Sequence, residues 1–213
     1  MSSSDFKLPE AAPVMVLPQC NFFPHTPLTL FIFEPRYRQM LAQVLESDRV
    51  FCVGTASEGV GNAPVDAEAG IYQHGTIGLV RACVKNDDGT SHLVLDGLQR
   101  VHFNEWIAEE PFRVATLTPI ETEITDLSEL DPLLDRLGEL LTEMREEKIS
   151  MPPLFGQDEW RSVEPAILAD WIANYFIEDV HARHILLSQP NLDERFHFLV
   201  AWMEGQVAAI KNG

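Results

Sequence analysis

The chain has 213 residues, and 46% of them are hydrophobic, which is enough to build a buried core in one large domain or two small ones. Its 33 acidic residues against 15 basic ones give a formal net charge of -18, which repels phosphate backbones and anionic membrane surfaces. We therefore expect no nucleic-acid partner and no membrane partner.

The cysteines and the first residues indicate a cytoplasmic protein. Cys20, Cys52 and Cys83 are far apart and form no C-x-x-C pair, which is typical of free thiols in a reducing compartment. The N-terminus has no basic segment followed by an apolar one, as a signal peptide would have, and no apolar run approaches the length of a membrane span.

The first third of the chain predicts a strand that runs directly into a helix. Residues 1–12 are expected to be a flexible tail, and residues 14–17 are expected to be a short strand. The apolar run 28–33 is too short for a buried helix and is predicted to be a strand. Pro35 fits the first position of the following helix, because its fixed φ is helical and its missing amide hydrogen is not needed there.

The next segment is rich in strands. Residues 85–90 carry an Asp-Gly pair, which favours a hairpin turn, and residues 55–74 contain small and acidic residues typical of a surface loop. The expected strands are 50–54, 76–84, 91–96, 101–107 and 112–120. We therefore predict a small, strongly bent sheet or barrel over residues 13–125.

Residues 126–213 are predicted to be helical. Leucines recur at helical spacing after residue 126, and further helices are expected at about 159–176 and 179–187. Asn191, followed three residues later by Glu194, is typical of the start of a last helix. Strands followed by helices indicate an α+β fold with a C-terminal helical bundle.

The sequence shows no catalytic or cofactor-binding motif. It has no phosphate-binding loop and no G-x-S-x-G nucleophile elbow. His181 and His184 form an H-x-x-H pair, but without a nearby cysteine or acidic partner they are a weak metal signal. We therefore predict no catalytic residue, no metal site and no cofactor.

Four residues are candidates for contact with a partner, and each has a structural alternative. Arg36 and Arg38 could bind a partner's carboxylate or form local salt bridges. Phe155 and Trp160 lie near a proline-rich break and could form an exposed apolar patch, or could pack in the seam between the two parts of the chain. The sequence leaves these alternatives open.

Four segments together resemble the N-terminal substrate-binding domain of the Lon ATP-dependent proteases. They are MVLPQCNFFPHTPLTLFIFEPRYRQML at 15–41, GTIGLVRACV at 75–84, DGLQRVHF at 96–103 and the helical stretch 168–203. The first segment is the most specific, because several unusual residues recur in fixed order. The signature residues expected to have structural roles are Phe33, Glu34, Pro35, Arg36, Tyr37, Gly78, Gly97 and Arg100.

This resemblance implies a PUA-like β-domain followed by a helical bundle, and a region that holds protein substrates for an attached ATPase and peptidase. Neither of these two enzymes is present in the 213 residues, so we expect a free-standing, non-catalytic module that engages unfolded or tagged polypeptides, with a protease or a chaperone as a further partner. The alternatives are a hydrolase with an unrecognised site and a nucleic-acid-binding PUA-like protein. Recognition is expected in the loop 55–74 and in the segment 151–160, because loops carry variable contacts.

Overall fold

The computed structural model describes residues 6–56, 70–124, 127–156 and 158–212. The chain forms two compact units, Met1–Ile120 and Glu121–Gly213. Most of the loop expected at 55–74, part of the expected tail and the expected boundary at 125/126 lie outside the described residues. The two units are described separately below.

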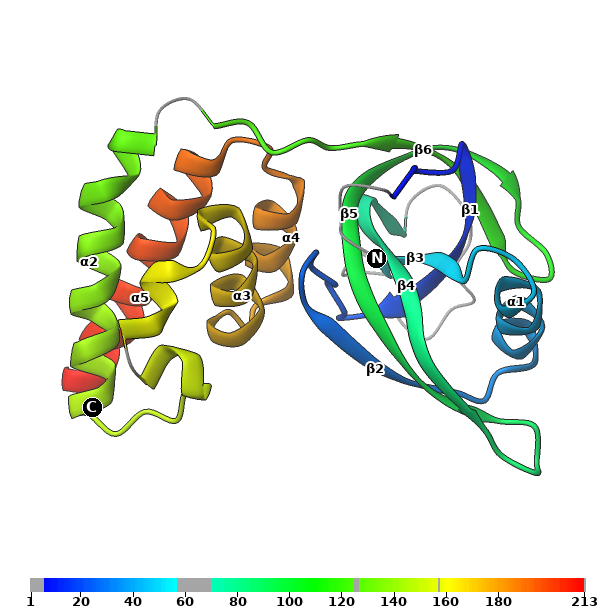
Figure 1. Cartoon of the computed structure of the whole chain (residues 1–213), viewed down its shortest axis with the longest axis horizontal. Coiled ribbons are helices and arrows are strands. Elements are labelled where there is room, and N and C mark those ends of the chain that lie inside the picture. Colours follow the sequence, from blue (N-terminus) through cyan, green and yellow to red (C-terminus); the bar gives the residue numbers. More distant parts are fainter. Residues whose placement is uncertain (1–5, 57–69, 125–126, 157, 213) are drawn as a thin grey trace. The chain divides into compact units, whose positions relative to one another are not determined.

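In its described residues, the first unit is a six-stranded, mixed sheet with one helix, α1 (Pro35–Leu45). The strands are β1 (Ala11–Pro18), β2 (Pro27–Ile32), β3 (Val50–Ala56), β4 (Ile71–Lys85), β5 (Ser91–Ala108) and β6 (Arg113–Pro119). Their order is β2-β5-β4-β3-β1-β6, and β6 also pairs with β5, so the sheet closes on itself (Figure 1). β1 and β3 are parallel, and the other pairs are antiparallel.

A single long strand, β5, closes this barrel. Residues 91–96 of β5 pair with β2, whereas residues 101–108 pair with β6. The sequence predicted two strands here, but the chain stays extended because β4 pairs along both halves, with bulges that bend the ladder. Within the described part of the chain, β2 therefore has β5 as its single neighbour, and its other edge is open.

β1 begins earlier than the sequence predicted. Ala11 and Ala12, which were expected in the flexible tail, pair with Thr116 and Ala115 of β6. Alanine carries little strand preference, so the pairing with a segment about a hundred residues away decides the conformation here.

Both faces of β3 are buried. Phe51 and Val53 belong to an apolar cluster that includes Met40 and other residues of α1, whereas Val50 and Cys52 belong to a second cluster among the strands. Burial raises the pKa of the Cys52 thiol far above its ordinary value, so this cysteine is unreactive at neutral pH.

The second unit consists of helices. These are α2 (Leu127–Glu146), the 3-10 turns η2 (Pro153–Gly156) and η3 (Asp158–Ser162), α3 (Pro165–Phe176), α4 (Val180–Ser188) and α5 (Leu192–Asn212). α5 packs against α2 and α3, and α4 packs against α3 (Figure 1). None of the helices in the described ranges is long and apolar enough to cross a membrane.

The helix starts follow the sequence signals, with one difference. The Asn191 side chain accepts a hydrogen bond from the Glu194 amide at 3.0 Å, which confirms the predicted cap of α5. The helix expected from about residue 159 is instead a 3-10 turn followed by α3. Pro165 explains the break, because proline is well placed in the first turn of a helix and disrupts a helix that would pass through it.

A buried ion pair joins α3 to α5. Arg195 and Asp170 are each 1% exposed, with Arg195 Nη1 at 3.4 Å from Asp170 Oδ1. Arg195 Nη2 also donates to the Thr122 hydroxyl at 2.9 Å. This arrangement fixes the start of the unit, before α2, against its last helix.

Candidate functional site

The Glu34-Pro35-Arg36-Tyr37-Arg38 segment turns the chain from β2 into α1. Pro35 occupies the first helical turn, as predicted, and the Arg38 amide donates to the Glu34 carbonyl to close that turn. Tyr37 is buried, and its hydroxyl donates to the Val16 carbonyl at 3.0 Å and accepts from the Val16 amide at 3.2 Å. The segment therefore anchors α1 to β1.

Arg36 is engaged locally. Its guanidinium donates to the Glu34 carboxylate at 2.9 Å and lies over the Tyr37 ring, with its central carbon 4.5 Å from the ring centroid. Of the two interpretations of Arg36 that the sequence left open, this geometry favours the local salt bridge.

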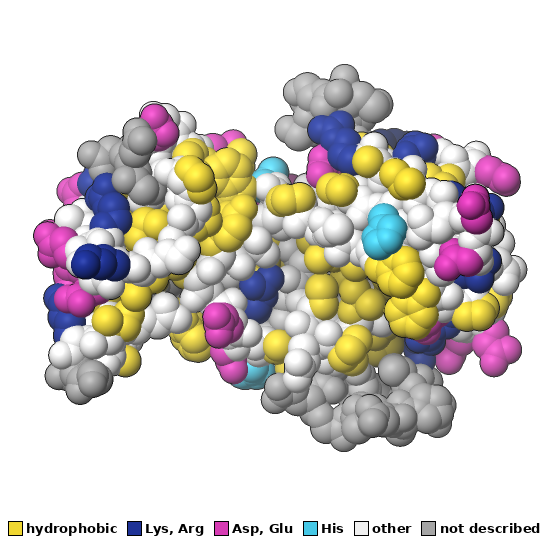
Figure 2. All heavy atoms as spheres, turned by 90° about the horizontal axis from the view of Figure 1, so that it is seen from below, with side chains coloured by type: hydrophobic (Ala, Val, Ile, Leu, Met, Phe, Trp, Pro, Cys, Tyr) yellow, Lys and Arg dark blue, Asp and Glu magenta, His cyan; other side chains and the backbone are white. Residues whose placement is uncertain are grey.

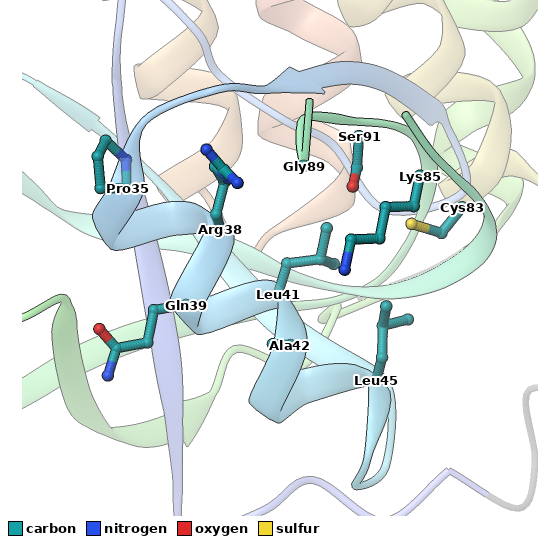
Figure 3. Close-up of a pocket in the computed structure, with 10 residues that line it drawn as sticks. All are labelled: Pro35, Arg38, Gln39, Leu41, Ala42, Leu45, Cys83, Lys85, Gly89 and Ser91. Atoms are coloured by element: carbon teal, nitrogen blue, oxygen red, sulfur yellow. The ribbon is translucent and has the colours of Figure 1, made fainter. Parts of the chain in front are cut away.

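Arg38 lies elsewhere, at the mouth of a pocket. The pocket has a volume of about 390 Å³ and lies between α1 and the β4–β5 hairpin (Figure 3). Arg38 packs against Gly89 of the hairpin turn, whose φ of +81° is one that glycine adopts without strain. The pocket is lined by Pro35, Arg38, Gln39, Leu41, Ala42, Leu45, Cys83, Lys85, Gly89 and Ser91.

The surroundings of this pocket are positively charged, although the chain as a whole is strongly acidic. Arg38 and Lys85 bring two cations, and none of the ten described lining residues carries a carboxylate. Arg38 also acts on Asp88 of the hairpin turn: the pKa of this carboxyl is lowered mainly by its hydrogen bonds from Thr90 and also by the charge of Arg38. Leu41 and Leu45 of α1 add apolar side chains to the same lining.

Phe155 and Trp160 do not form an exposed patch, which excludes the first of the two alternatives that the sequence left open. They are 0% and 1% exposed, respectively. The Phe155 ring contacts the rings of Tyr175 and Phe176 edge-on, with centroids 6.2 and 5.2 Å apart. Trp160 packs close to Gly138 of α2. Both residues are core of the helical unit, because the break at residues 151–153 folds the chain back onto α2 and α3.

An exposed apolar surface lies instead on the first, strand-rich unit, which is called the β-unit below. In the sheet register, Phe31 of β2 is directly opposite His92 of β5, which is opposite Val84 of β4. Phe31 and Val84 are 49% and 65% exposed, and Phe33, which stacks on Phe31 with centroids 5.9 Å apart, is 59% exposed. The Phe31 and His92 rings are stacked at 4.6 Å. These four residues are called the apolar row below.

Sequence reasoning missed most of the apolar row. Phe33 was expected to have a structural role, but its side chain lies on the surface. The alternation of this strand shows only in the structure, where Leu28, Leu30 and Ile32 are more buried than Thr29 and Phe31. Figure 2 shows hydrophobic side chains gathered beside an exposed histidine on the molecular surface.

Three other signature residues lie inside the β-unit. Gly97 is buried under the 23–26 loop and exchanges two backbone hydrogen bonds with it, and Arg100 is buried on β5. A side chain at Gly78 would meet Leu95 and Phe22 at 2.6–2.8 Å. These positions hold the barrel and the loop that precedes β2.

The apolar row and the pocket lie on opposite faces of the same sheet end. Phe31, His92 and Val84 form one cross-strand row, and the next row consists of Ile32, Ser91 and Lys85. Successive residues of a strand point to opposite faces, so Ser91 and Lys85 line the pocket while the apolar row faces away from it. One short stretch of three strands thus carries both surfaces.

The described residues offer no arrangement for metal chemistry. Within the four ranges that the structure covers, no three His, Cys, Asp or Glu side chains are grouped to hold a metal ion. A shallow depression over α2 and η3 is lined mainly by acidic residues, and it includes Glu143, which pairs with Lys211 at 2.7 Å.

The barrel with its Tyr37 anchor, followed by a helical unit, matches a known class of protein. The family model described as the "ATP-dependent protease La (LON) substrate-binding domain" matches residues 11–205. The chain belongs to this family. Neither an ATPase nor a peptidase domain is matched in these residues.

Curated relatives and solved structures agree with this assignment. The Lon protease of Azospirillum brasilense is 26% identical over 216 residues, which cover 99% of this chain and 26% of that protein. The Lon protease of Desulfosudis oleivorans is 22% identical over 207 residues, which cover 97% of this chain and 25% of that protein. The chain spans about a quarter of the length of the curated relatives it matches.

Two solved structures share the fold. The N-terminal domain of the Mycobacterium avium complex Lon protease has a TM-score of 0.69 and 16% identity, with 91% of this chain and 98% of that one covered. A Lon N-terminal domain protein from Xanthomonas campestris has a TM-score of 0.63 and 19% identity, with 90% and 98% covered. The predicted resemblance to Lon N-terminal domains and the α+β fold are thus confirmed.

Proposed function

We propose that this chain is a non-catalytic module that binds unfolded or otherwise extended polypeptides through the apolar row. The observation that carries this proposal is the exposure of Phe31 and Phe33 beside the open edge of β2, with the exposed Val84 of β4 in the same row. Exposed apolar side chains in a contiguous group mark interaction surfaces, and a free strand edge accepts an extended peptide as an added strand. Membership in a substrate-binding family supports the same conclusion.

An extended segment fits this surface better than a folded protein does. Backbone hydrogen bonds to β2 would align such a segment, and its side chain opposite Phe31 would extend the apolar row by one strand. The backbone bonds carry no sequence preference, so specificity would follow the number of large apolar side chains. Folded proteins bury these side chains, whereas unfolded ones expose them.

An ATP-dependent protease or a chaperone that receives the bound polypeptide is the further partner we propose.

The test is fluorescence anisotropy with a labelled, permanently unfolded protein, compared with the same protein kept native. We expect tighter binding of the unfolded form and no fragments on a gel. Phe31→Ser should weaken binding roughly tenfold, because one buried aromatic anchor contributes on the order of 1–2 kcal/mol.

Ile107→Ser is the matched control, since Ile107 is a similarly exposed apolar residue of the same sheet, at 57%, but lies in the half of β5 that pairs with β6 and not with β2. Equal losses for Phe31→Ser and Ile107→Ser, or equal affinity for the native and unfolded forms, would contradict the proposal. Accumulating fragments would favour a hydrolase instead.

A further inference from the structure

The pocket between α1 and the β4–β5 hairpin has features of a second, different binding site. Its two cations, Arg38 and Lys85, come from separate elements and lie on the same pocket, beside the apolar side chains of Leu41 and Leu45 (Figure 3). Because the positive charges and the apolar side chains lie in one pocket, the pocket fits a ligand that carries an anionic group next to a hydrocarbon group.

The cations are available to a ligand. Among the residues that the structure describes, neither Lys85 nor Arg38 forms a salt bridge, and the charge of Arg38 acts on the exposed carboxylate of Asp88. By contrast, Arg36, two residues before Arg38, is held by Glu34 at 2.9 Å. In a chain of net charge -18, a pocket whose lining has two cations and no carboxylate is electrostatically complementary to an anion.

We infer that this pocket binds the C-terminal carboxylate of a polypeptide whose last residue is apolar. An α-carboxylate lies two bonds from the Cβ of its own residue, so one terminal residue places a carboxylate and an apolar side chain together. A carboxylate on an internal Asp or Glu replaces the apolar side chain and needs a neighbouring residue to contact Leu41 and Leu45. The Ser91 hydroxyl adds a hydrogen-bonding group to the same lining.

This inference rests on the proposed function, since it assigns part of the same polypeptide to a second place on the β-unit. The pocket and the apolar row lie on opposite faces of the β2–β5–β4 end, separated by one register step. A bound chain that follows the open edge of β2 can pass from one face to the other around that edge. The pocket thereby gives the module a preference for chain ends over internal segments.

The test uses a labelled 20-residue peptide of uncharged, mainly apolar residues that ends in leucine, made with a free C-terminal carboxylate and as the C-terminal amide. We expect amidation to weaken binding about fivefold, which corresponds to ~1 kcal/mol for two partly screened ion pairs. In the Lys85→Gln or Arg38→Gln variant, the affinities of the two peptides should differ by less than about twofold. Lys7→Gln removes an exposed cation elsewhere in the same unit and should keep the full difference.

The rate of cysteine alkylation shows where the peptide binds. Cys83 lines the pocket and is half-buried, as is Cys20 outside it, so the carboxylate peptide should slow alkylation of Cys83 and leave that of Cys20 unchanged. Unchanged alkylation of Cys83 with the peptide bound would overturn the assignment. The assignment would also be overturned if an amidated peptide with an internal Glu bound as tightly as the free-acid peptide. The pocket would then bind a side-chain carboxylate and not the chain end.

The two proposals fail in different ways. Equal binding of the free acid and the amide, with both weakened by Phe31→Ser, would overturn the pocket and leave the apolar row in place. Absence of binding for both peptides and for the unfolded protein would overturn both proposals.

Discussion

Gly97→Ala should destabilise the β-unit more than any conservative surface change. A Cβ at residue 97 would overlap the Phe23 carbonyl oxygen and would lie 2.9 Å from Pro24 Cα. These are backbone atoms that cannot rotate away, so the 23–26 loop has to move. The His25 amide donates to the Gly97 carbonyl at 2.9 Å, and the Gly97 amide donates to the Thr26 carbonyl at 3.0 Å.

The expected loss follows from these contacts. Two backbone hydrogen bonds at about 0.5–1.5 kcal/mol each and about 1–3 kcal/mol of overpacking strain give a loss of about 2–6 kcal/mol in the free energy of unfolding. This is a large share of the roughly 5–15 kcal/mol that holds a domain folded. The loss of unfolding free energy should appear in the β-unit and not in the helical unit.

The assay is guanidinium unfolding, with hydrogen exchange and mass spectrometry to assign the change to one unit. Gly205→Ala is the control, because it lies in α5 with nothing within 4 Å of the added Cβ. This control should stabilise the helical unit by about 0.5–1 kcal/mol through helix propensity. If Gly97→Ala unfolds within about 0.5 kcal/mol of the parent chain, the close approach at Gly97 is not the constraint described.

Three further changes test other parts of the structure. Tyr37→Phe removes the hydroxyl that hydrogen-bonds to the amide and carbonyl of Val16 in β1. It should lower the free energy of unfolding in urea by about 1–3 kcal/mol. An unchanged midpoint would show that these hydrogen bonds are dispensable. Asp170→Ala leaves the buried Arg195 without its ion-pair partner and should cost about 3–5 kcal/mol in the helical unit, whereas a loss below ~1 kcal/mol would mean that the unit relaxes around the cation. Burial, with the His102 imidazole nearby, lowers the pKa of His74 below 6.5, so its contribution to stability is complete above that pH and is lost as pH falls through 6.5 towards the folded-state pKa. His74→Gln should flatten this acid-side decline in the unfolding free energy, and an identical pH profile would assign the decline to other groups.

Local signals located the elements well. Pro35 marked the start of α1, Asn191 marked that of α5, and the Asp-Gly turn marked the β4–β5 hairpin, because each depends on the conformational preference of a few adjacent residues. The extension of β1 to Ala11 and the continuity of β5 could not be predicted in this way, since both depend on pairing with distant strands.

The candidate site was harder to predict for the same reason. Phe155 and Trp160 lie beside prolines, which indicate a chain reversal but not the helices on which the reversal packs. The strand 28–33 is almost entirely apolar, so the sequence did not show which face of β2 is exposed. Arg36 and Arg38 look equivalent in the sequence, and the position of Glu34 together with the register of α1 gives them different partners.

The order of the strands has a consequence for synthesis. β6, the last strand of the barrel, pairs with β1, the first, so the barrel cannot close until Pro119 has left the ribosome. Until then, both β1 and the second half of β5 present unpaired edges and the apolar residues that β6 later covers. A module that we propose to hold unfolded chains is thus itself exposed to capture by chaperones until β6 has emerged.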